Sequence, residues 1–313
     1  MTNVIEVEHL VKSYGDFTAV RDLSFAVRPG EVFCLLGPNG AGKTTTTEIL
    51  EGYRDRSAGS VSVLGFDPGD GDRAFRERIG IVLQECGVQA DLTVAEVLDM
   101  YGRYYPRRLP TADVIDLVEL DAKATDRVGQ LSGGQRRRLD IGLALIGDPD
   151  LIFLDEPTTG FDPSARRHSW STIRALCGLG KTVLLTTHFM DEAEALADRI
   201  AVVAGGRIVA EGTPADLGGR NRARSAVEAT LPAHLPVALP GFGPAEVTVL
   251  GDRVRIVGDD GVAITHRLTT WAVDNRLELA GLTVSQPSLE DIYLALTDNL
   301  ADPRVAPTKE THR

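Results

Sequence analysis

Cysteine is scarce in this sequence, since 313 residues contain only Cys34, Cys86 and Cys177. None of the three stands in a CxxC pair or at a spacing typical of metal ligands. We therefore expect neither a disulfide framework nor a cysteine-ligated metal site. Cys34 lies within an apolar run, which favours a small buried hydrophobic residue in a reducing cytosol.

Positive charge and long hydrophobic runs are also lacking. Acidic residues outnumber Lys and Arg by 45 to 33, so the formal net charge is −12. This balance argues against a nucleic-acid clamp, whose affinity depends on clustered Lys and Arg. A solvated or phosphate-adjacent helix face explains the three arginines at 136–138 better than DNA binding does. No signal peptide precedes Val4, and no apolar run approaches the length needed to span a bilayer.

A glycine-rich segment, GPNGAGKT, matches the phosphate-binding loop pattern G-x-x-x-x-G-K-[ST]. It stands between an apolar run, 31–36, and a helix-compatible run, 45–50. Glycines let backbone N–H groups turn toward a polyphosphate, and the helix N-terminus adds its positive dipole end. A Gly-rich turn with a stray lysine is the alternative interpretation of the pattern alone. The expected nucleotide-binding residues are Gly37, Pro38, Asn39, Gly40, Ala41, Gly42, Lys43, Thr44 and Thr45.

Within this loop Lys43 can reach the β- and γ-phosphates, and the Thr44 hydroxyl can ligate Mg²⁺. Two acids follow a second apolar run, Leu151–Leu154, which is typical of a buried parallel strand. Because adjacent strand residues point to opposite faces, we expect the two carboxylates to have different roles. Asp155 is the better Mg²⁺ partner, and Glu156 is the better candidate to orient or deprotonate water. A solvated acidic strand end is the alternative.

A third segment, LSGGQ, comprises Leu131, Ser132, Gly133, Gly134 and Gln135. Together the three segments resemble the ATP-binding cassette of ABC transporters, over roughly residues 4–218. LSGGQ is the signature that distinguishes this family from other P-loop ATPases. The resemblance implies an ATPase with ATP and Mg²⁺ as substrate and cofactor.

Smaller motifs extend the resemblance. Tyr14 matches the aromatic residue that stacks on adenine, and Gln84 the glutamine that touches Mg²⁺ and faces the membrane partner. Asp162 matches the aspartate that communicates across the dimer, and His188 the switch histidine that contacts the γ-phosphate. Singly, Tyr14 is more often a strand-end aromatic and His188 an ordinary helix-start residue. Their shared order favours the functional interpretation, and only Phe161, where Leu is commoner, departs from the pattern.

The family mechanism makes the signature a second phosphate-binding helix end. Ser132 and the amides of Gly133 and Gly134 complete the site of an opposing protomer, so two cassettes enclose two ATP molecules. We therefore expect a homodimer, with weak hydrolysis by one cassette alone. The resemblance also implies an integral-membrane permease supplied by another chain, and a peripheral location on the cytoplasmic face of the cell membrane. Nucleic acid is not expected as a partner.

The expected fold is α/β, a P-loop cassette with a RecA-like core, an antiparallel β-subdomain within residues 4–36 and a helical subdomain at about 86–150. Alternating strand and helix signals after Asp150 favour a parallel core, which includes the run 199–212. The cassette is expected to cover 1–218, an accessory or regulatory α+β domain 219–300, and a flexible tail 301–313.

In the accessory domain, two runs flank Gly251–Asp252 and predict a β-hairpin. Helical spacing at 261–275 and an apolar strand at 277–284 follow. Ser288, with Asp291 three residues later, predicts a capped helix start.

The segment QPSLEDIYLALT, at 286–297, resembles the C-terminal box of the daunorubicin-resistance branch of bacterial ABC exporter ATPases, and the signature run also matches that branch. The hypothesis is an ATP-hydrolysing subunit of a drug or antibiotic exporter. An ATPase for lipid, polysaccharide or haem is the alternative. The pore selects the cargo, and since the pore is another polypeptide, this sequence does not distinguish between cargoes. A soluble ABC protein of translation or repair is less favoured, since translation factors carry two cassettes and this chain has one.

Overall fold

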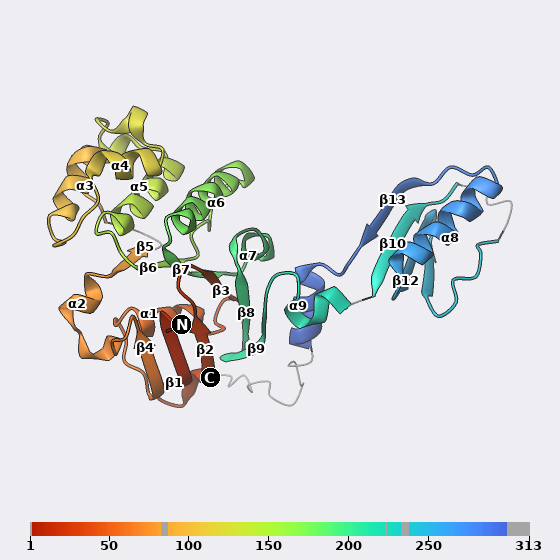
Figure 1. Ribbon diagram of the computed structural model, residues 1–313, viewed down its shortest axis with the longest axis horizontal. Coiled ribbons are helices and arrows are strands. Elements are labelled where there is room, and N and C mark those ends of the chain that lie inside the picture. Colours follow the sequence, from red (N-terminus) through yellow and green to blue (C-terminus); the bar gives the residue numbers. More distant parts are fainter. Residues whose placement is uncertain (1, 83–86, 223, 233–237, 299–313) are drawn as a thin grey trace, which may run out of the picture. The chain divides into compact units, whose positions relative to one another are not determined.

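A computed structural model describes residues 2–82, 87–222, 224–232 and 238–298 (Figure 1). The chain divides into two compact units, Met1–Pro214 and Ala215–Arg313, here called the cassette unit and the C-terminal unit. The division falls between residues 214 and 215, whereas the sequence predicted a boundary after residue 218.

A six-stranded sheet forms the centre of the cassette unit, in the order β5-β6-β7-β3-β8-β9. Four of its pairings are parallel, and β8 pairs with β9 in antiparallel fashion. The expectation of a parallel core therefore holds for β8, at 199–204, and is wrong for β9, at 207–212, because the chain folds back as a hairpin through Gly205 and Gly206, both at positive φ. The strands are β3 (Val32–Leu36), β5 (Ile79–Val82), β6 (Leu151–Asp155), β7 (Thr182–Thr187), β8 (Arg199–Ala204) and β9 (Arg207–Gly212).

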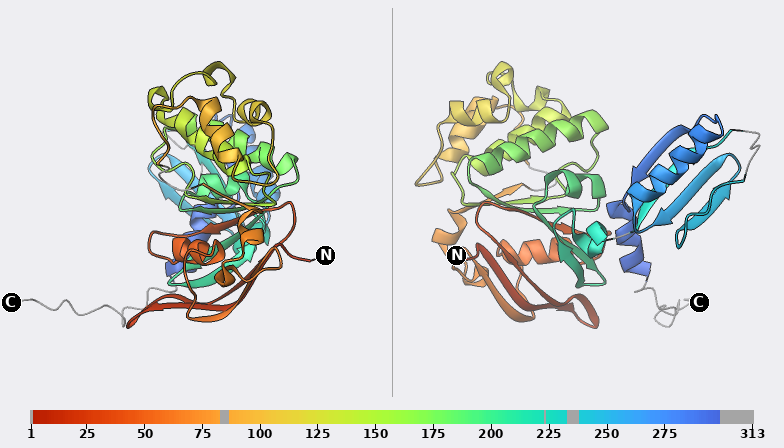
Figure 2. Two further views of the ribbon diagram at one scale, coloured as in Figure 1. Left: turned by 90° about the vertical axis from the view of Figure 1, so that its left-hand side faces the viewer. Right: turned by 45° about the vertical axis from the view of Figure 1, so that its right-hand side comes forward.

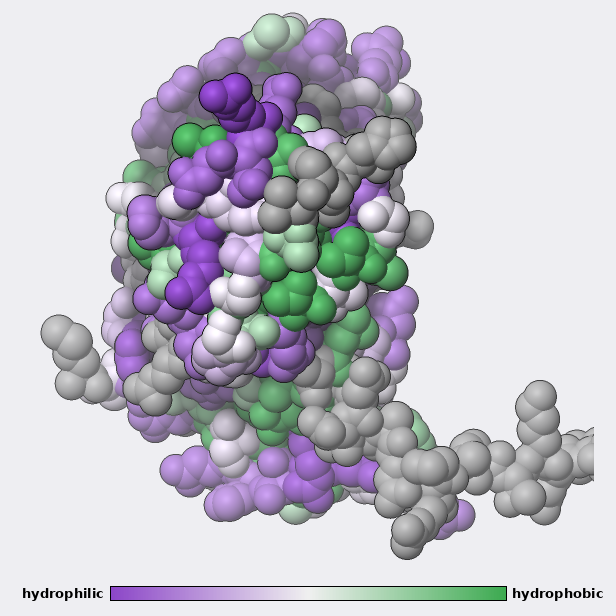
Figure 3. Space-filling model, turned by 90° about the vertical axis from the view of Figure 1, so that its right-hand side faces the viewer, coloured by the Kyte–Doolittle hydropathy of each residue, from purple (hydrophilic) through white to green (hydrophobic). Residues whose placement is uncertain are grey.

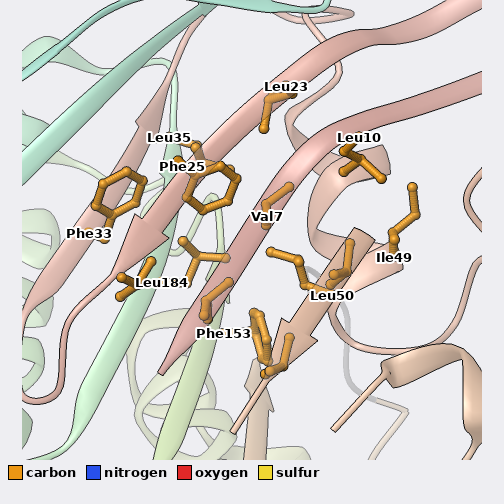
Figure 4. Packing of buried hydrophobic residues seen from close by; sticks show 14 of the residues in the cluster. Val7, Leu10, Leu23, Phe25, Phe33, Leu35, Ile49, Leu50, Phe153 and Leu184 are labelled. Atoms are coloured by element: carbon orange, nitrogen blue, oxygen red, sulfur yellow. The ribbon is translucent and has the colours of Figure 1, made fainter. Parts of the chain in front are cut away.

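A separate three-stranded antiparallel sheet has the order β2-β1-β4, from β1 (Ile5–Tyr14), β2 (Phe17–Val27) and β4 (Ala58–Val63). Its apolar face packs against the central sheet, where the rings of Phe25 and Phe33 stack with centroids 5.2 Å apart (Figure 4). Leu10, Leu50 and Phe153 belong to the same buried cluster. The predicted β-subdomain is therefore present, although β3 belongs to the central sheet.

Helices surround the central sheet of the cassette unit (Figure 1). The helical region expected at about 86–150 contains α3 and α4, and both pack against α5. Thr93 begins α3 with a capping box, in which its hydroxyl accepts the Glu96 N–H. The helices are α1 (Lys43–Leu50), α2 (Arg73–Arg76), α3 (Val94–Gly102), α4 (Thr111–Leu117), α5 (Gly133–Leu145), α6 (Pro163–Gly178) and α7 (Met190–Leu196), with short 3₁₀ turns η1 (Pro68–Asp70), η2 (Asp121–Lys123) and η3 (Val128–Gln130).

The three consecutive arginines serve the packing of α5. Arg136, Arg137 and Arg138 donate hydrogen bonds to the carbonyl oxygens of Val128, Pro157 and Glu119, at 3.2, 3.0 and 2.9 Å. Arg137 is buried, which corrects the expectation of a solvated or phosphate-adjacent face for all three. The guanidinium groups satisfy main-chain carbonyls at the ends of neighbouring segments.

The C-terminal unit is a four-stranded antiparallel sheet in the order β11-β12-β10-β13, with α8 along one face (Figure 2). Val227, Ile256, Leu268 and Trp271 form part of the core between helix and sheet. The predicted hairpin, helix and final strand are all present. The elements are η4 (Leu217–Arg222), β10 (Ser225–Thr230), β11 (Glu246–Leu250), β12 (Arg253–Gly258), α8 (Gly261–Asp274), β13 (Ala280–Ser285) and α9 (Leu289–Asp298).

The last helix of this unit begins as the sequence predicts. The Ser288 hydroxyl accepts the Asp291 N–H at 3.0 Å, and the Asp291 carboxylate accepts the Ser288 N–H at 2.8 Å. The helix packs on η4, where a Cβ at Gly218 would lie 2.5 Å from a methyl group of Ile292. Hydrophobic and hydrophilic side chains both reach the surface displayed in Figure 3. Within the described ranges, no helix combines the length and hydropathy that a membrane crossing requires.

Candidate active site

The residues of the candidate site lie at the carboxyl ends of three neighbouring strands of the central sheet. In the order β6-β7-β3 all three run parallel, so their carboxyl ends lie at one edge. At this edge a hydrogen bond joins β3 to β7: the Gly37 N–H, just after β3, donates to the Thr187 carbonyl at the end of β7, at 3.2 Å. The sheet topology therefore brings together the phosphate loop, the two acids and His188.

The phosphate loop contains glycines that its geometry requires. A Cβ at Gly37 would lie 2.2 Å from the Val203 carbonyl oxygen. Gly42 has φ +101°, and a Cβ there would lie 2.7 Å from the Ala19 carbonyl oxygen. Gly40 also has positive φ, at +80°. These positions exclude side chains and leave the loop's main chain open to an approaching phosphate.

Lys43 is almost fully enclosed by this loop, with 4% of its surface exposed. Its ammonium donates to the carbonyl oxygens of Gly37 and Pro38, at 2.8 and 3.1 Å. The Nζ also lies 3.6 Å from Oε1 of Glu156. Burial lowers the pKa of Lys43, and the negative charges of Glu156 and Asp155 oppose that shift. The loop thus holds a cation at its centre, as a site for phosphate oxygens requires.

Thr44 and Asp155 lie together in the manner a magnesium site needs. The Thr44 hydroxyl donates to Oδ2 of Asp155 at 3.3 Å. The other carboxylate oxygen accepts the Thr186 hydroxyl. A hydroxyl and a carboxylate are hard oxygen donors of the kind that Mg²⁺ prefers, so this donor pair fits the ion. Gln84, the third expected metal ligand, lies outside the described residues.

Glu156 has different partners from Asp155. Oε1 of Glu156 lies 3.2 Å from Nδ1 of His188, at an angle that does not make a hydrogen bond. Oε2 accepts the Thr159 hydroxyl at 3.1 Å. The two carboxylates thus point to different partners, but strand alternation is not the reason. Strand β6 ends at Asp155, and Glu156 turns away because its φ is +45°.

Sequence patterns did not single out Thr186, which ties the two acids together. Its hydroxyl donates to the Asp155 carboxylate. The Glu156 N–H donates to both the hydroxyl and the carbonyl oxygen of Thr186, each at 3.1 Å, and the Thr186 side chain is fully buried. Asp155 and Thr186 are cross-strand partners in the β6–β7 pair. The only signal was the Thr-Thr pair before His188, which a single sequence does not separate from ordinary strand threonines.

Tyr14 stands at the end of β1 with 40% of its surface exposed. The Lys12 Nζ and Arg54 Cζ lie 5.1 and 5.4 Å from the ring centroid. The adjoining strand β2 reaches the phosphate loop through Ala19, whose carbonyl approaches Gly42. An exposed ring at this place is able to stack on a flat aromatic group.

The signature residues begin α5 in a separate region. Ser132 is the N-cap: its hydroxyl accepts the Gln135 N–H at 3.3 Å, and Oε1 of Gln135 accepts the Ser132 N–H at 2.9 Å. A Cβ at Gly133 or Gly134 would meet nothing within 4 Å. Within the described part of the chain, no hydrogen bond or ion pair joins residues 131–135 to 37–45. Asp162 is exposed immediately before α6.

Comparison with known proteins identifies both units. Residues 20–159 match the family model "ABC transporter", and residues 225–288 match "ABC transporter domain-containing protein-like, C-terminal domain". The Nod factor export ATP-binding protein I of Rhizobium etli is 40% identical over 94% of this chain and 93% of its own length. The protein of that name in Paraburkholderia xenovorans is 41% identical over 94% and 96%.

Solved structures share the fold of the cassette unit. The cbiO1 protein of Clostridium perfringens, part of the ABC transporter complex cbiONQ, aligns with a TM-score of 0.63 and 27% identity. That alignment covers 69% of this chain and 90% of cbiO1. An ATP-binding cassette of an ABC transporter in its ADP conformation aligns with a TM-score of 0.60 and 25% identity, over 68% and 92%. The chain therefore belongs to the ABC transporter family as an ATP-binding subunit, an ATPase that uses ATP and Mg²⁺.

Proposed function

We propose that this ATPase energises the export of a drug or antibiotic through a permease supplied by another chain. It acts as a peripheral subunit on the cytoplasmic face of the membrane. The assignment to export is supported by two relatives, named as export ATP-binding proteins, that align over 94% of the chain. The C-terminal segment 286–297, which resembles the daunorubicin-resistance box, supports the drug-exporter branch.

The single observation that carries the hydrolytic role is the placement of Glu156. Its carboxylate lies 3.6 Å from the Lys43 ammonium and 3.2 Å from His188, at the mouth of the phosphate loop. A carboxylate at this place can accept a proton from water that attacks the γ-phosphate. Lys43 holds the β- and γ-phosphates, and His188 holds the transferred phosphoryl group.

Thr44, Asp155 and Gln84 are proposed to hold Mg²⁺, which would neutralise charge on the phosphate oxygens. Tyr14 is proposed to stack on the adenine base. The remaining loop residues, 37–42 and Thr45, are proposed to surround the phosphates, and all of them except Pro38 carry a main-chain N–H group. Asp155 is fixed for this role by the Thr186 hydroxyl.

The active assembly is proposed to be a homodimer in which each signature completes the partner's site. Support comes from Gly133 and Gly134, because neither needs to be glycine for this chain's own packing. A glycine that leaves open space at a helix N-terminus fits the close approach of a phosphate from another subunit. Leu131, Ser132 and Gln135 build the helix end, and Asp162 lies on the exposed surface where two cassettes would meet.

Export of a Nod factor is the second candidate, because relatives at 40% and 41% identity are named for that cargo. Lipid, polysaccharide or haem transport, and a soluble non-transport ATPase, are less favoured. Inverted membrane vesicles that contain the chain and its co-expressed permease distinguish these functions. ATP-dependent uptake of daunorubicin, absent with Glu156→Gln, is expected. Uptake of Nod factor instead would establish the second candidate, and uptake of neither would contradict both.

A further inference from the structure

The ring of His188 is not held in place by a hydrogen bond to any described residue. Its Nδ1 atom is buried and makes no hydrogen bond within the described part of the chain. The Glu156 carboxylate approaches this nitrogen to 3.2 Å, without the angle of a hydrogen bond. His188 also lies outside the regular elements, between the end of β7 and the start of α7. The packing of neighbouring side chains must therefore set the position of the ring.

Phe189 supplies that packing. Its ring lies against the ring of His188, with the two centroids 4.0 Å apart and the planes tilted by 39°. Phe189 is the N-cap of α7, and its N–H donates to the Thr187 hydroxyl at 3.0 Å. The main chain of Phe189 is thus tied to the end of β7, which keeps its ring beside the histidine.

Arg166, on α6, covers the Phe189 ring in turn. Its guanidinium carbon lies 4.1 Å from the centroid of that ring. Its Nη1 atom donates to the carboxylate of Asp191, in the first turn of α7, at 3.0 Å. A cation this close to a ring is attracted by the negative charge of the ring face. Arg166, Phe189 and His188 therefore form a contact chain from α6 to the candidate active site.

Helix α7 has other attachments that do not involve this contact chain. Glu192, which is fully buried, accepts the Thr158 hydroxyl at 2.8 Å and the Trp170 Nε1–H at 3.2 Å. Further along α6, the exposed Arg174 donates to the Ala195 carbonyl at 3.0 Å. These bonds join α7 to α6 and to the segment after β6. Loss of the contact chain should therefore leave the helix in place and release only the histidine ring.

We propose that Phe189 and Arg166 are positioning residues, which hold the His188 ring where the γ-phosphate of ATP binds. This inference rests on the proposed function, in which His188 holds the transferred phosphoryl group. It adds the means by which the histidine is aimed, namely packing against an aromatic ring that a cation covers. Because ADP has no γ-phosphate, the contact chain affects the turnover of ATP and leaves the affinity for ADP unchanged.

The first test measures ATP turnover and ADP affinity of the full-length protein, with circular dichroism to verify the fold. Phe189→Leu and Arg166→Met should lower kcat about tenfold, because a misplaced group loses its effect on the reaction. Their ADP affinity should stay at the wild-type value. Phe189→Tyr keeps the ring and Arg166→Lys keeps the cation, so both should retain most of the turnover.

Arg174→Met is the matched control, because it removes an arginine contact between α6 and α7 that does not reach His188. It should turn over ATP at the wild-type rate. An equal loss of turnover in this control, or a parallel loss of ADP affinity in Phe189→Leu, would show a general packing effect and overturn the proposal. Wild-type turnover in Phe189→Leu or in Arg166→Met would also overturn it.

The second test asks whether Phe189 acts through His188. His188→Ala should lower turnover, and Phe189→Leu added to it should cause no further fall, because the group that it positions is already gone. A further tenfold fall would overturn the proposal. Wild-type turnover of His188→Ala would contradict the role given to His188 under the proposed function, and the inference with it. Low turnover of His188→Ala beside normal turnover of Phe189→Leu would contradict the inference alone.

Discussion

At the scale of single residues, the site depends on a few charged groups held in position by main-chain carbonyls and threonine hydroxyls. Lys43 is enclosed by the loop carbonyls of Gly37 and Pro38, and Asp155 by the hydroxyls of Thr44 and Thr186. Phosphate oxygens carry more charge than these carbonyl oxygens, so we expect them to be the stronger acceptors for the Lys43 ammonium.

Lys43→Ala removes this central cation. We expect ATP affinity to fall by about 1.5–3 kcal/mol, the scale of a charged hydrogen bond. Titration with a fluorescent ATP analogue measures the change, and circular dichroism verifies the fold. Nearly normal affinity in a folded variant would show that the loop does not hold phosphate in the proposed way.

Glu51→Gln has a predicted effect on stability that changes with pH. In the native state burial raises the pKa of Glu51 from 4.5 to about 8. Between those values the unfolded chain has released this proton and the folded chain keeps it, so wild-type stability falls as pH rises. The slope is at most about 1.4 kcal/mol per pH unit, and it vanishes above about pH 8.

Thermal melts at pH 5 and pH 8 test this directly. The Gln variant should gain in melting temperature over the wild type at pH 8 and show little gain at pH 5. Asp116→Asn provides the matched control with an exposed acid. An identical gain at the two pH values would mean that Glu51 does not titrate in this range.

At the scale of elements, local motifs were predictable and distant pairings were not. The phosphate loop, the N-cap Ser132 and the N-cap Ser288 are each set by residues within eight consecutive positions, so their patterns are visible in the sequence. The contact of Thr186 with Asp155 was not predictable, because it depends on the register of β6 against β7. The burial of Glu51 was not predictable either, because it comes from elements far along the chain.

The antiparallel direction of strand β9 has a local sequence signal. Gly205 and Gly206 both have positive φ, and a Gly-Gly pair between two apolar runs is typical of a tight hairpin. The sequence therefore contained the evidence for an antiparallel edge. The direction of Glu156 had no comparable signal, because a non-glycine residue at φ +45° is uncommon and is imposed by the surrounding structure.

The N-terminus of α5 carries a prediction about the dimer. Gly133→Ala should leave folding and ATP binding by the isolated chain unchanged, because the new methyl group meets nothing within 4 Å and alanine is a better helix former. ATP turnover should fall about tenfold or more, since the methyl group would obstruct a partner's phosphate. Wild-type turnover in this variant would remove the support for a site shared between subunits.

At the scale of the whole molecule, catalytic groups and accessory fold lie in different units. Every proposed nucleotide-binding residue precedes position 190, whereas the C-terminal unit has its own sheet and core. A domain of about 100 residues buries little apolar surface on its own, which favours a role in association with a dimer partner or the permease.

A chain that ends at Pro214 tests that separation. It omits η4 and α9, which pack together within the C-terminal unit, and so leaves the cassette unit intact. We expect ATP binding to be retained, and permease co-purification and transport to be largely lost. If the truncated and full-length proteins are equal in both assays, the C-terminal unit has no role in assembly.

The most direct test of the central claim is the ATP turnover of Glu156→Gln, measured together with ATP binding and gel filtration. The amide keeps the shape of the side chain but accepts no proton. We therefore expect turnover to fall about 100-fold or more, with ATP affinity retained and an ATP-dependent dimer accumulating. Hydrolysis at the wild-type rate would contradict the account, because Glu156 would then not act on the attacking water.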